Sequence, residues 1–170
     1  DTQIMVLGHY KTILTYIYEA IKHRGISTVG YYIGGMKEIE LKKSEGKKII
    51  IATYAMAEEG LDIKTLTTLV MATPKSDVTQ AVGRILRKKR DESLVIDIVD
   101  PHIIFQKQYM KRKRFYKKQN FQLKETDMNG YYKDEWELKL TNKKSKGACT
   151  KKKSKNTPFM NGVCLIKDDD

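Results

Sequence analysis

Two arginines, Arg84 and Arg87, stand three residues apart at the end of a segment, 77–86, whose pattern predicts a short helix. Residues three apart share one face of a helix, so both guanidinium groups can point across the same cleft. Phosphoryl transfer loads negative charge on the oxygens of the transferred phosphate, and guanidinium groups brought to those oxygens stabilise it. One hypothesis is therefore a phosphoryl-transfer hydrolase. The alternative is that both arginines belong to the basic run 87–90 on a solvated face.

A second group of candidate residues follows the apolar run 49–52. An unalternated β-branched run predicts a strand that is buried on both faces, and parallel sheets bind ligands at the carboxyl ends of their strands. There the hydroxyl of Thr53 can donate to a nucleic-acid phosphate. Gly60 permits a close backbone approach, and Asp62 can accept from a ribose hydroxyl of a nucleotide. A simple strand end for Thr53 and a helix cap for Asp62 remain the alternatives.

A third group follows the first apolar run, 4–7. His9 and Lys11 stand where they can contact a phosphate backbone, although a histidine at a strand end is often structural. Gly34 and Gly35 close the next expected strand, and a simple turn is their other interpretation.

The charge of the chain is unevenly distributed. The formal net charge is +12; residues 1–100 carry 15 basic and 13 acidic side chains, and residues 101–170 carry 18 and 8. The stretch 111–118 combines lysine and arginine with Phe115 and Tyr116, so it can follow a phosphate backbone and offer a stacking surface. The alternative is a long helix with Phe115 packed on the sheet and lysines in water. The lysines of 143–155 suit non-specific polyanion attraction or nuclear localisation.

Cys149 and Cys164 have no CxxC partner and no nearby histidine. They predict reduced thiols in a cytosolic or nuclear-type compartment, with no zinc site. No apolar run approaches the roughly 18 residues of a membrane span, and no signal peptide opens the chain. We therefore expect neither a membrane-bound nor a secreted protein, although a targeting segment could lie upstream if the chain is an excised piece.

The elements that must position these residues alternate between short apolar runs and amphipathic stretches, which predicts an α/β fold with a parallel sheet. Strands are expected at 4–7, 28–33, 49–52, 67–71 and 94–99, and helices from about 13 to 25 and at 36–43, 77–86 and 103–121. Residues 142–157 are too polar to fold and predict a disordered linker. The apolar island 159–166 is either a terminal strand or a docking peptide. We expect one domain over 1–122 and a basic, partly disordered tail over 123–170.

Three segments resemble, in order and spacing, the second-domain motifs of superfamily 2 helicases. They are Ile4–His9 with Tyr31–Met36, then Ala52–Ile63, and last Gln80–Arg87 in the form Gln-x-x-Gly-Arg-x-x-Arg. The resemblance covers residues 1–120 and looks closest to helicases of large DNA viruses and phages. It implies a RecA-like, P-loop NTPase-type parallel sheet with helices on both faces. The expected location is the cytoplasm or nucleus, a viral factory or a virion.

The resemblance also implies roles for single residues. Arg84 and Arg87 would be arginine fingers, Gln80 would sense the γ-phosphate or the attacking water, and Gly60 and Asp62 would contact the nucleotide. The nucleic-acid contacts would be Thr53, His9, Lys11 and Gly35.

No GxxxxGK[ST] loop and no Walker B Asp-Glu pair occurs in the chain. ATP and Mg²⁺ would therefore be held mainly by an upstream RecA-like domain, and the chain alone would be inactive.

The resemblance implies DNA as the partner, and RNA is also possible because motif contacts go mostly to the backbone and carry no base readout. Glu58 and Glu59 depart from the Ala-Arg of DEAD-box enzymes, which puts any contact of that arginine in doubt. Two other functions stay open. One is a non-enzymatic nucleic-acid-binding module, which would not require Gln80, Arg84 and Arg87. The other is a translocase that releases transcripts or remodels complexes without unwinding a duplex.

Overall fold

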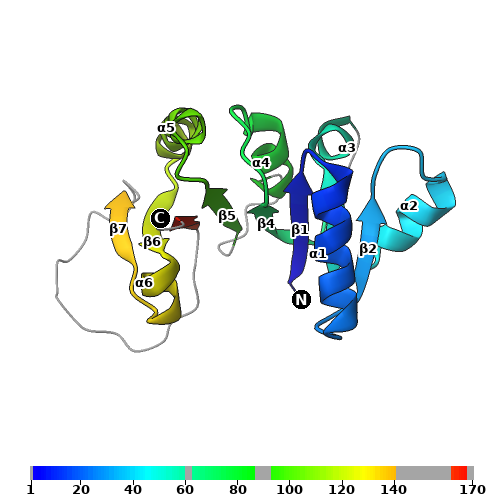
Figure 1. The fold of residues 1–170 in the computed structure, drawn as a ribbon. Coiled ribbons are helices and arrows are strands. Elements are labelled where there is room, and N and C mark those ends of the chain that lie inside the picture. The colour runs from blue at the N-terminus through cyan, green and yellow to red at the C-terminus, as the bar shows by residue number, and fades with distance from the viewer. Residues whose placement is uncertain (1, 60–62, 87–92, 141–161, 168–170) are drawn as a thin grey trace.

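The structure, a computed structural model, describes residues 2–59, 63–86, 93–140 and 162–167, with only the backbone for 84–86 and 162–167 (Figure 1). The strands are β1 Gln3–Gly8, β2 Val29–Tyr32, β3 Ile49–Thr53, β4 Leu66–Met71, β5 Leu94–Val99, β6 Gln122–Asp127, β7 Glu137–Leu140 and β8 Gly162–Lys167. The helices are α1 Lys11–His23, α2 Glu38–Glu45, α3 Tyr54–Glu59, α4 Thr79–Leu86, α5 Ile103–Lys118 and α6 Met128–Tyr132.

The strands of these ranges form one sheet in the order β2-β3-β1-β4-β5-β8-β6-β7. Neighbouring strands are parallel, except that β7 pairs antiparallel with β6. Because the five expected strands are parallel neighbours, their carboxyl ends meet at one edge of the sheet. This edge, called the carboxyl edge below, is where a parallel sheet binds its ligands.

Alternating side chains of the strands build two apolar layers. On one face, Met5, Leu7 and Ile50 pack with residues of α3, α4 and α5 such as Ala57 and Val82. On the other face, Val6 and Ile51 pack with Leu14 of α1, and partly buried Ile17 and Ile21 extend that contact. The near-continuous apolar runs of β1 and β3 are explained by this cover on both faces.

Two helix ends depend on left-handed residues. Gly25, at φ +60°, follows α1, and the amide of Ile26 donates to the carbonyl oxygen of Ile21 at 3.4 Å. Asn120, at φ 59°, follows α5, and the amide of Phe121 donates to the carbonyl oxygen of Tyr116 at 3.0 Å. Both are Schellman-type ends. The helix expected over 103–121 therefore stops at Lys118, because Asn120 turns the chain into β6.

The sheet continues beyond residue 122, where the sequence predicted the start of a tail. β6, α6 and β7 lie on the far side of that expected boundary, and β8 enters the sheet between β5 and β6. Of the two interpretations of the island 159–166, the structure has the terminal strand. The expected linker 142–157, which contains the lysine run 143–155 and Cys149, lies outside the described residues. The expectation of a domain boundary at 122 remains an expectation.

Candidate functional site at the carboxyl edge

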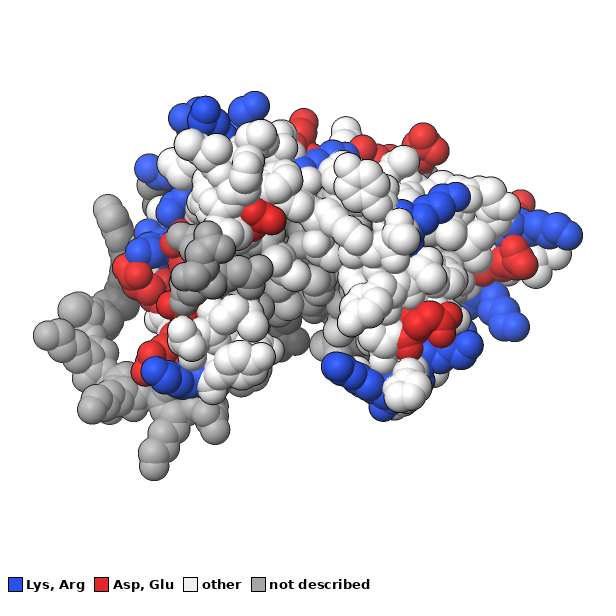
Figure 2. Space-filling model, in the orientation of Figure 1, with Lys and Arg blue, Asp and Glu red and all other residues white. Residues whose placement is uncertain are grey.

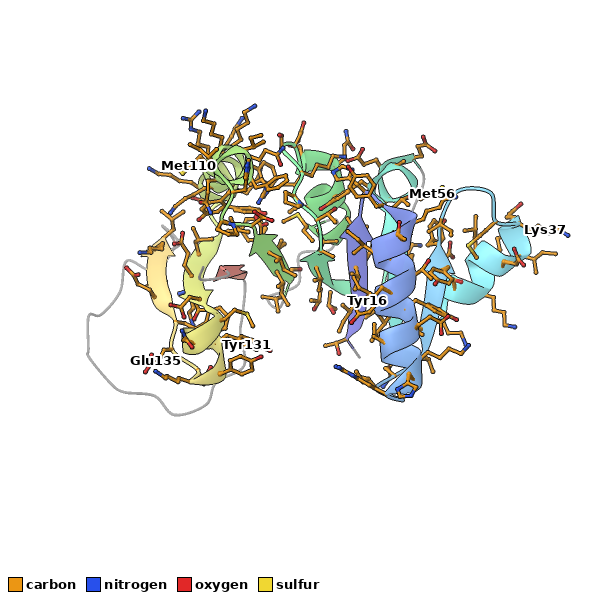
Figure 3. The ribbon with its side chains drawn as sticks, viewed as in Figure 1. Tyr16, Lys37, Met56, Met110, Tyr131 and Glu135 are labelled. Atoms are coloured by element: carbon orange, nitrogen blue, oxygen red, sulfur yellow. The ribbon has the colours of Figure 1, made fainter. Side chains whose placement is uncertain are left out.

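Several predicted site residues lie at the carboxyl edge. His9 follows β1, Gly35 lies in the loop after β2, Thr53 ends β3, and α4, which contains Gln80, follows the loop after β4. The upper edge in Figure 3, where Met56 of α3 is labelled, is this part of the sheet. The parallel topology thus brings together segments that are up to 70 residues apart in sequence.

The loop between β4 and α4 is held by three side chains from three different elements. Each donates to one of three consecutive carbonyl oxygens. The pairs are Tyr54 Oη to Thr73 O at 2.7 Å, His9 Nε2 to Pro74 O at 3.1 Å, and Arg112 Nη1 to Lys75 O at 2.7 Å. The bond of His9 requires the tautomer that carries its proton on Nε2. A loop with all three carbonyls bonded presents the start of α4 in one fixed position.

Further contacts tie the same loop to α3. The ammonium of Lys75 pairs with the carboxylate of Glu58 and lies 4.8 Å from the ring centroid of Tyr54. The backbone amide of His9 also donates to the hydroxyl of Thr73 at 3.0 Å. Burial, and secondarily the charge of Asp97, raises the pKa of the Tyr54 hydroxyl far above its ordinary value. That hydroxyl therefore stays protonated and remains a donor.

Behind this loop lies a fully buried charge pair between β5 and α5. Asp97 accepts from Nε of Arg112 at 2.7 Å and from Nη2 at 2.9 Å, and each residue is 1% exposed. The hydroxyl of Tyr116 adds a third bond to Asp97 at 3.0 Å. Burial raises the pKa of the Asp97 carboxyl, whereas the guanidinium and then the hydroxyl lower it. Because Nη1 donates to the carbonyl oxygen of Lys75, all three guanidinium nitrogens of Arg112 form hydrogen bonds.

Thr53 is half-buried, and its hydroxyl oxygen accepts from the amide of Met56 at 3.4 Å, so it caps the first turn of α3. This local bond leaves the Thr53 hydroxyl proton free to donate elsewhere. Lys11 is exposed, and its ammonium donates to the carbonyl oxygen of Gly34 at 3.4 Å. Gly35 has φ +91°, a conformation that suits glycine, so the turn interpretation of this loop describes the backbone.

The expected helix at 77–86 forms as α4. Asp77 Oδ1 accepts from the amide of Thr79 at 2.9 Å, as expected of a capping residue. Gln80 is exposed, whereas Ala81 and Val82 are buried, so Gln80 lies on the solvent side of α4. Arg84 belongs to α4 by its backbone. Gly60, Asp62 and Arg87 lie outside the residues that the structure describes.

The sequence did not predict that Tyr54 and Arg112 hold the β4–α4 loop, and it predicted a different role for His9. Arg112 was counted in the exposed basic run 111–118, yet it is buried. Two signals could have found it. Asp97 stands in the middle of an apolar strand, and a buried carboxylate requires a partner; Tyr109, Arg112 and Tyr116 have the spacing of one helix face. Phe115 is half-buried and packs against the core, so the packed-helix alternative holds for that ring.

Neither a metal centre nor a membrane span is found within the described ranges. No group of three or more His, Cys, Asp and Glu side chains there could hold a metal ion. No helix in the same part of the chain is long and apolar enough to cross a membrane.

Five parallel strands with helices packed on both faces form the fold of the C-terminal RecA-like domain of helicases. The solved C-terminal domain of Dbp5 from S. cerevisiae, in complex with Gle1 and IP6, matches with a TM-score of 0.53 and 18% identity, covering 68% of either chain. The fold class expected from the sequence is confirmed.

The relatives in sequence are named as helicases of large DNA viruses, and the chain, which is similar to them, has the fold of a C-terminal RecA-like helicase domain. It is 45% identical over 113 residues to a protein of Acanthamoeba polyphaga mimivirus that is named as an ATP-dependent RNA helicase; the match covers 65% of this chain and 22% of that protein. It is 28% identical over 128 residues to a protein of African swine fever virus with the same kind of name, covering 69% and 25%. No family model matches the chain.

The chain thus spans about a quarter or less of these two relatives. The recognition made from the motifs is confirmed. The names of both relatives specify RNA, so they give no support to the expectation that the partner is DNA.

Proposed function

We propose that this chain is the second motor domain of an ATP-dependent RNA helicase or translocase. In this proposal an upstream RecA-like domain holds ATP and Mg²⁺, and this domain closes over the nucleotide. Its carboxyl edge then supplies one wall of the ATP cleft and one wall of the nucleic-acid groove. Closing and opening with each hydrolysis cycle would shift the grip on the strand.

The observation that most supports the proposal is the convergence of all three motif segments on one edge of the sheet. Gln80 is exposed at the start of α4, and Arg84 follows one turn later. Residues four apart share a helix face, and continued spacing of three would bring Arg87 to the same side. Charge on the γ-phosphate oxygens would be stabilised by these arginines, while Gln80 orients the attacking water. Gly60 and Asp62 would contact the nucleotide.

The nucleic-acid wall of the groove would be formed by His9, Lys11, Gly35 and Thr53. Of these, Lys11 is exposed and Thr53 retains a free hydroxyl proton, so both can donate to phosphate oxygens. Nε2 of His9 is already bonded to the carbonyl oxygen of Pro74, so only Nδ1 remains for a ligand. The names of the two viral relatives favour RNA over DNA as the strand that is bound.

The proposal is tested by ATP turnover. The chain alone should hydrolyse no ATP above a buffer blank, because stabilising the transition state needs the upstream phosphate-binding domain as well. In the protein extended by that domain, Arg87→Ala should lower turnover by on the order of 10³-fold with nucleotide binding largely intact. Arg90→Ala, in the same basic run, is the matched control and should keep turnover. Equal turnover in both variants would reject Arg87 as an arginine finger, whereas no turnover by the extended protein at all would favour a non-enzymatic binding module.

A further inference from the structure

α5 carries a row of cations that the proposed motor cycle does not use. The helix contains seven lysines and arginines and no acidic residue. Figure 2 shows blue side chains gathered over α5 at the upper left of the molecule. In Figure 3, long side chains ending in nitrogen extend outward from the same helix, around the labelled Met110.

The exposure of the basic side chains of α5 depends on their position around the helix. Lys107, Lys111, Arg114 and Lys118 are all exposed. With about 3.6 residues per turn, their spacings of four, three and four place them within an arc of about 60°. The opposite side of the helix carries its buried residues, Tyr109, Arg112 and Tyr116. These four cations, called the α5 ridge below, therefore form a row along the outer side of the helix; Lys117 is exposed as well but lies to one side of this row.

Two other cations of α5 have partners within the fold. Arg112 is bonded to Asp97 and to the carbonyl of Lys75, and the ammonium of Lys113 pairs with Glu125 at 2.9 Å. Among the described residues, no acidic side chain forms an ion pair with the α5 ridge, and the helix itself carries none. A row of like charges without counter-charges on its own helix is destabilising to the isolated chain. A polyanion bound along the row would remove this repulsion.

The dimensions of the α5 ridge fit a phosphate backbone. From Lys107 to Lys118 the helix rises about 16 Å at about 1.5 Å per residue. Phosphates along one strand of a duplex follow each other at about 3.4 Å of axial rise, so the ridge can run along about five of them. The flexible ends of lysine and arginine can adjust to phosphates that do not match the helix spacing, and no base readout is required.

The ridge stands on a rigid support. α5 is bonded to β5 through Asp97 and to β6 through Glu125, and Tyr116 on its inner side is fully buried. Arg112 also bonds α5 directly to the loop before α4. A strand held on the ridge would therefore be attached to the same rigid unit as the carboxyl edge.

We propose that the α5 ridge is a second nucleic-acid contact of this domain, which binds the phosphate backbone of an RNA strand outside the carboxyl edge. The inference rests on the proposed function for its choice of RNA. It assigns to the ridge a sequence-independent contact that adds affinity and depends steeply on salt.

The test compares two variants of the 170-residue chain that lose the same charge. The ridge variant carries Lys107→Gln, Lys111→Gln, Arg114→Gln and Lys118→Gln. The matched control carries Lys22→Gln, Arg24→Gln, Lys43→Gln and Lys48→Gln, which are exposed cations on or next to α1, α2 and β3. Circular dichroism and thermal unfolding establish that both variants keep the fold. Fluorescence anisotropy then measures their affinity for a labelled single-stranded RNA between 50 and 200 mM salt.

Each phosphate contact on a single strand contributes about 0.7 to the slope of log affinity against log salt. If all four cations contact phosphates, the slope of the ridge variant should be shallower by about 3. The affinity of the unmodified chain should then fall about sixtyfold more than that of the ridge variant over the fourfold range of salt. The control variant should keep the slope of the unmodified chain.

Three results would overturn the inference. The first is an equal slope of log affinity against log salt in the ridge and control variants, which would mean that the salt dependence reflects net charge alone. The second is no RNA binding by the unmodified chain at all. The third is tighter binding of a labelled polyglutamate than of the RNA, lost in the ridge variant, which would make the ridge a docking site for an acidic protein. None of these depends on ATP turnover, so failure of the ridge is distinguishable from failure of the motor proposal.

Discussion

Replacing Arg112 with methionine removes the cation from a charge pair that is completely shielded from water. The remaining carboxylate of Asp97 is 1% exposed and would keep only the hydroxyl of Tyr116 as a partner. Breaking a buried pair by removing one partner costs about 3–5 kcal/mol, because an uncompensated charge stays in the interior. The carbonyl oxygen of Lys75 loses its donor as well.

This loss is large compared with the stability of an ordinary domain, which is about 5–15 kcal/mol. With a urea dependence of about 2 kcal/mol per molar, a loss of about 4 kcal/mol lowers the unfolding midpoint by about 2 M. Urea unfolding followed by circular dichroism measures this shift. Arg114→Met, on the exposed side of the same helix, is the control and should change stability by no more than about 0.5 kcal/mol.

A double replacement separates the burial of charge from the loss of packing. Asp97→Leu combined with Arg112→Met removes both charges and leaves apolar side chains of similar size, so it should recover most of the stability lost by Arg112→Met alone. The reasoning would be refuted if Arg112→Met unfolded within about 0.5 M urea of the Arg114→Met control. It would equally fail if the double variant were less stable than Arg112→Met.

Three further changes have defined outcomes in the same urea assay. Gly83→Ala should stabilise the chain by about 0.5–1 kcal/mol, because Gly83 lies within α4 and an added methyl group meets open space. Gly130→Ala should destabilise it by about 1–3 kcal/mol, because the new methyl carbon would lie 2.5 Å from the hydroxyl oxygen of Thr126. Asp77→Ala should lower the free energy of unfolding by about 1 kcal/mol, the usual contribution of a helix cap. The bond from the amide of Thr79 lowers the pKa of Asp77, so this contribution is present above the ordinary pKa of 3.8 and is lost as the pH falls below it. A pH-independent difference between Asp77→Ala and the unmodified chain would contradict that account.

The sequence predicted the fold well where periodicity carries the information. The strand expected at 94–99 forms as β5 with the same bounds, because its apolar run has no competing interpretation in a βα alternation. The position of β8 beside β5 could not be predicted. Residues 163–167 pair with residues 95–99, which stand more than sixty positions earlier, and nothing in a short apolar segment specifies its neighbours.

The candidate site was predictable to the extent that it follows from parallel strands. Thr53 and His9 were expected at strand ends, and the topology brings those ends to one edge. Arg112 was not predictable from its local sequence, because it stands between lysines and an arginine in a run with the composition of a solvated surface. Its burial follows from a carboxylate on another element, so the composition of the run alone does not reveal it, and only its spacing from Tyr109 and Tyr116 points to the buried side of the helix.

The loop before α4 is held both by residues expected at strand ends and by a residue from a distant helix. Its three bonded carbonyls belong to Thr73, Pro74 and Lys75, which are outside all three helicase-like segments, and so is one of their donors, Arg112. A backbone carbonyl accepts a hydrogen bond whatever its side chain, so these three bonds depend on their donors and not on the side chains of the loop. The position of α4 therefore depends on Tyr54, His9 and Arg112 as well as on its own motif. Residues that only hold a loop in place can thus be as necessary to the position of a helix, here one proposed to contact the nucleotide, as the residues on its exposed face.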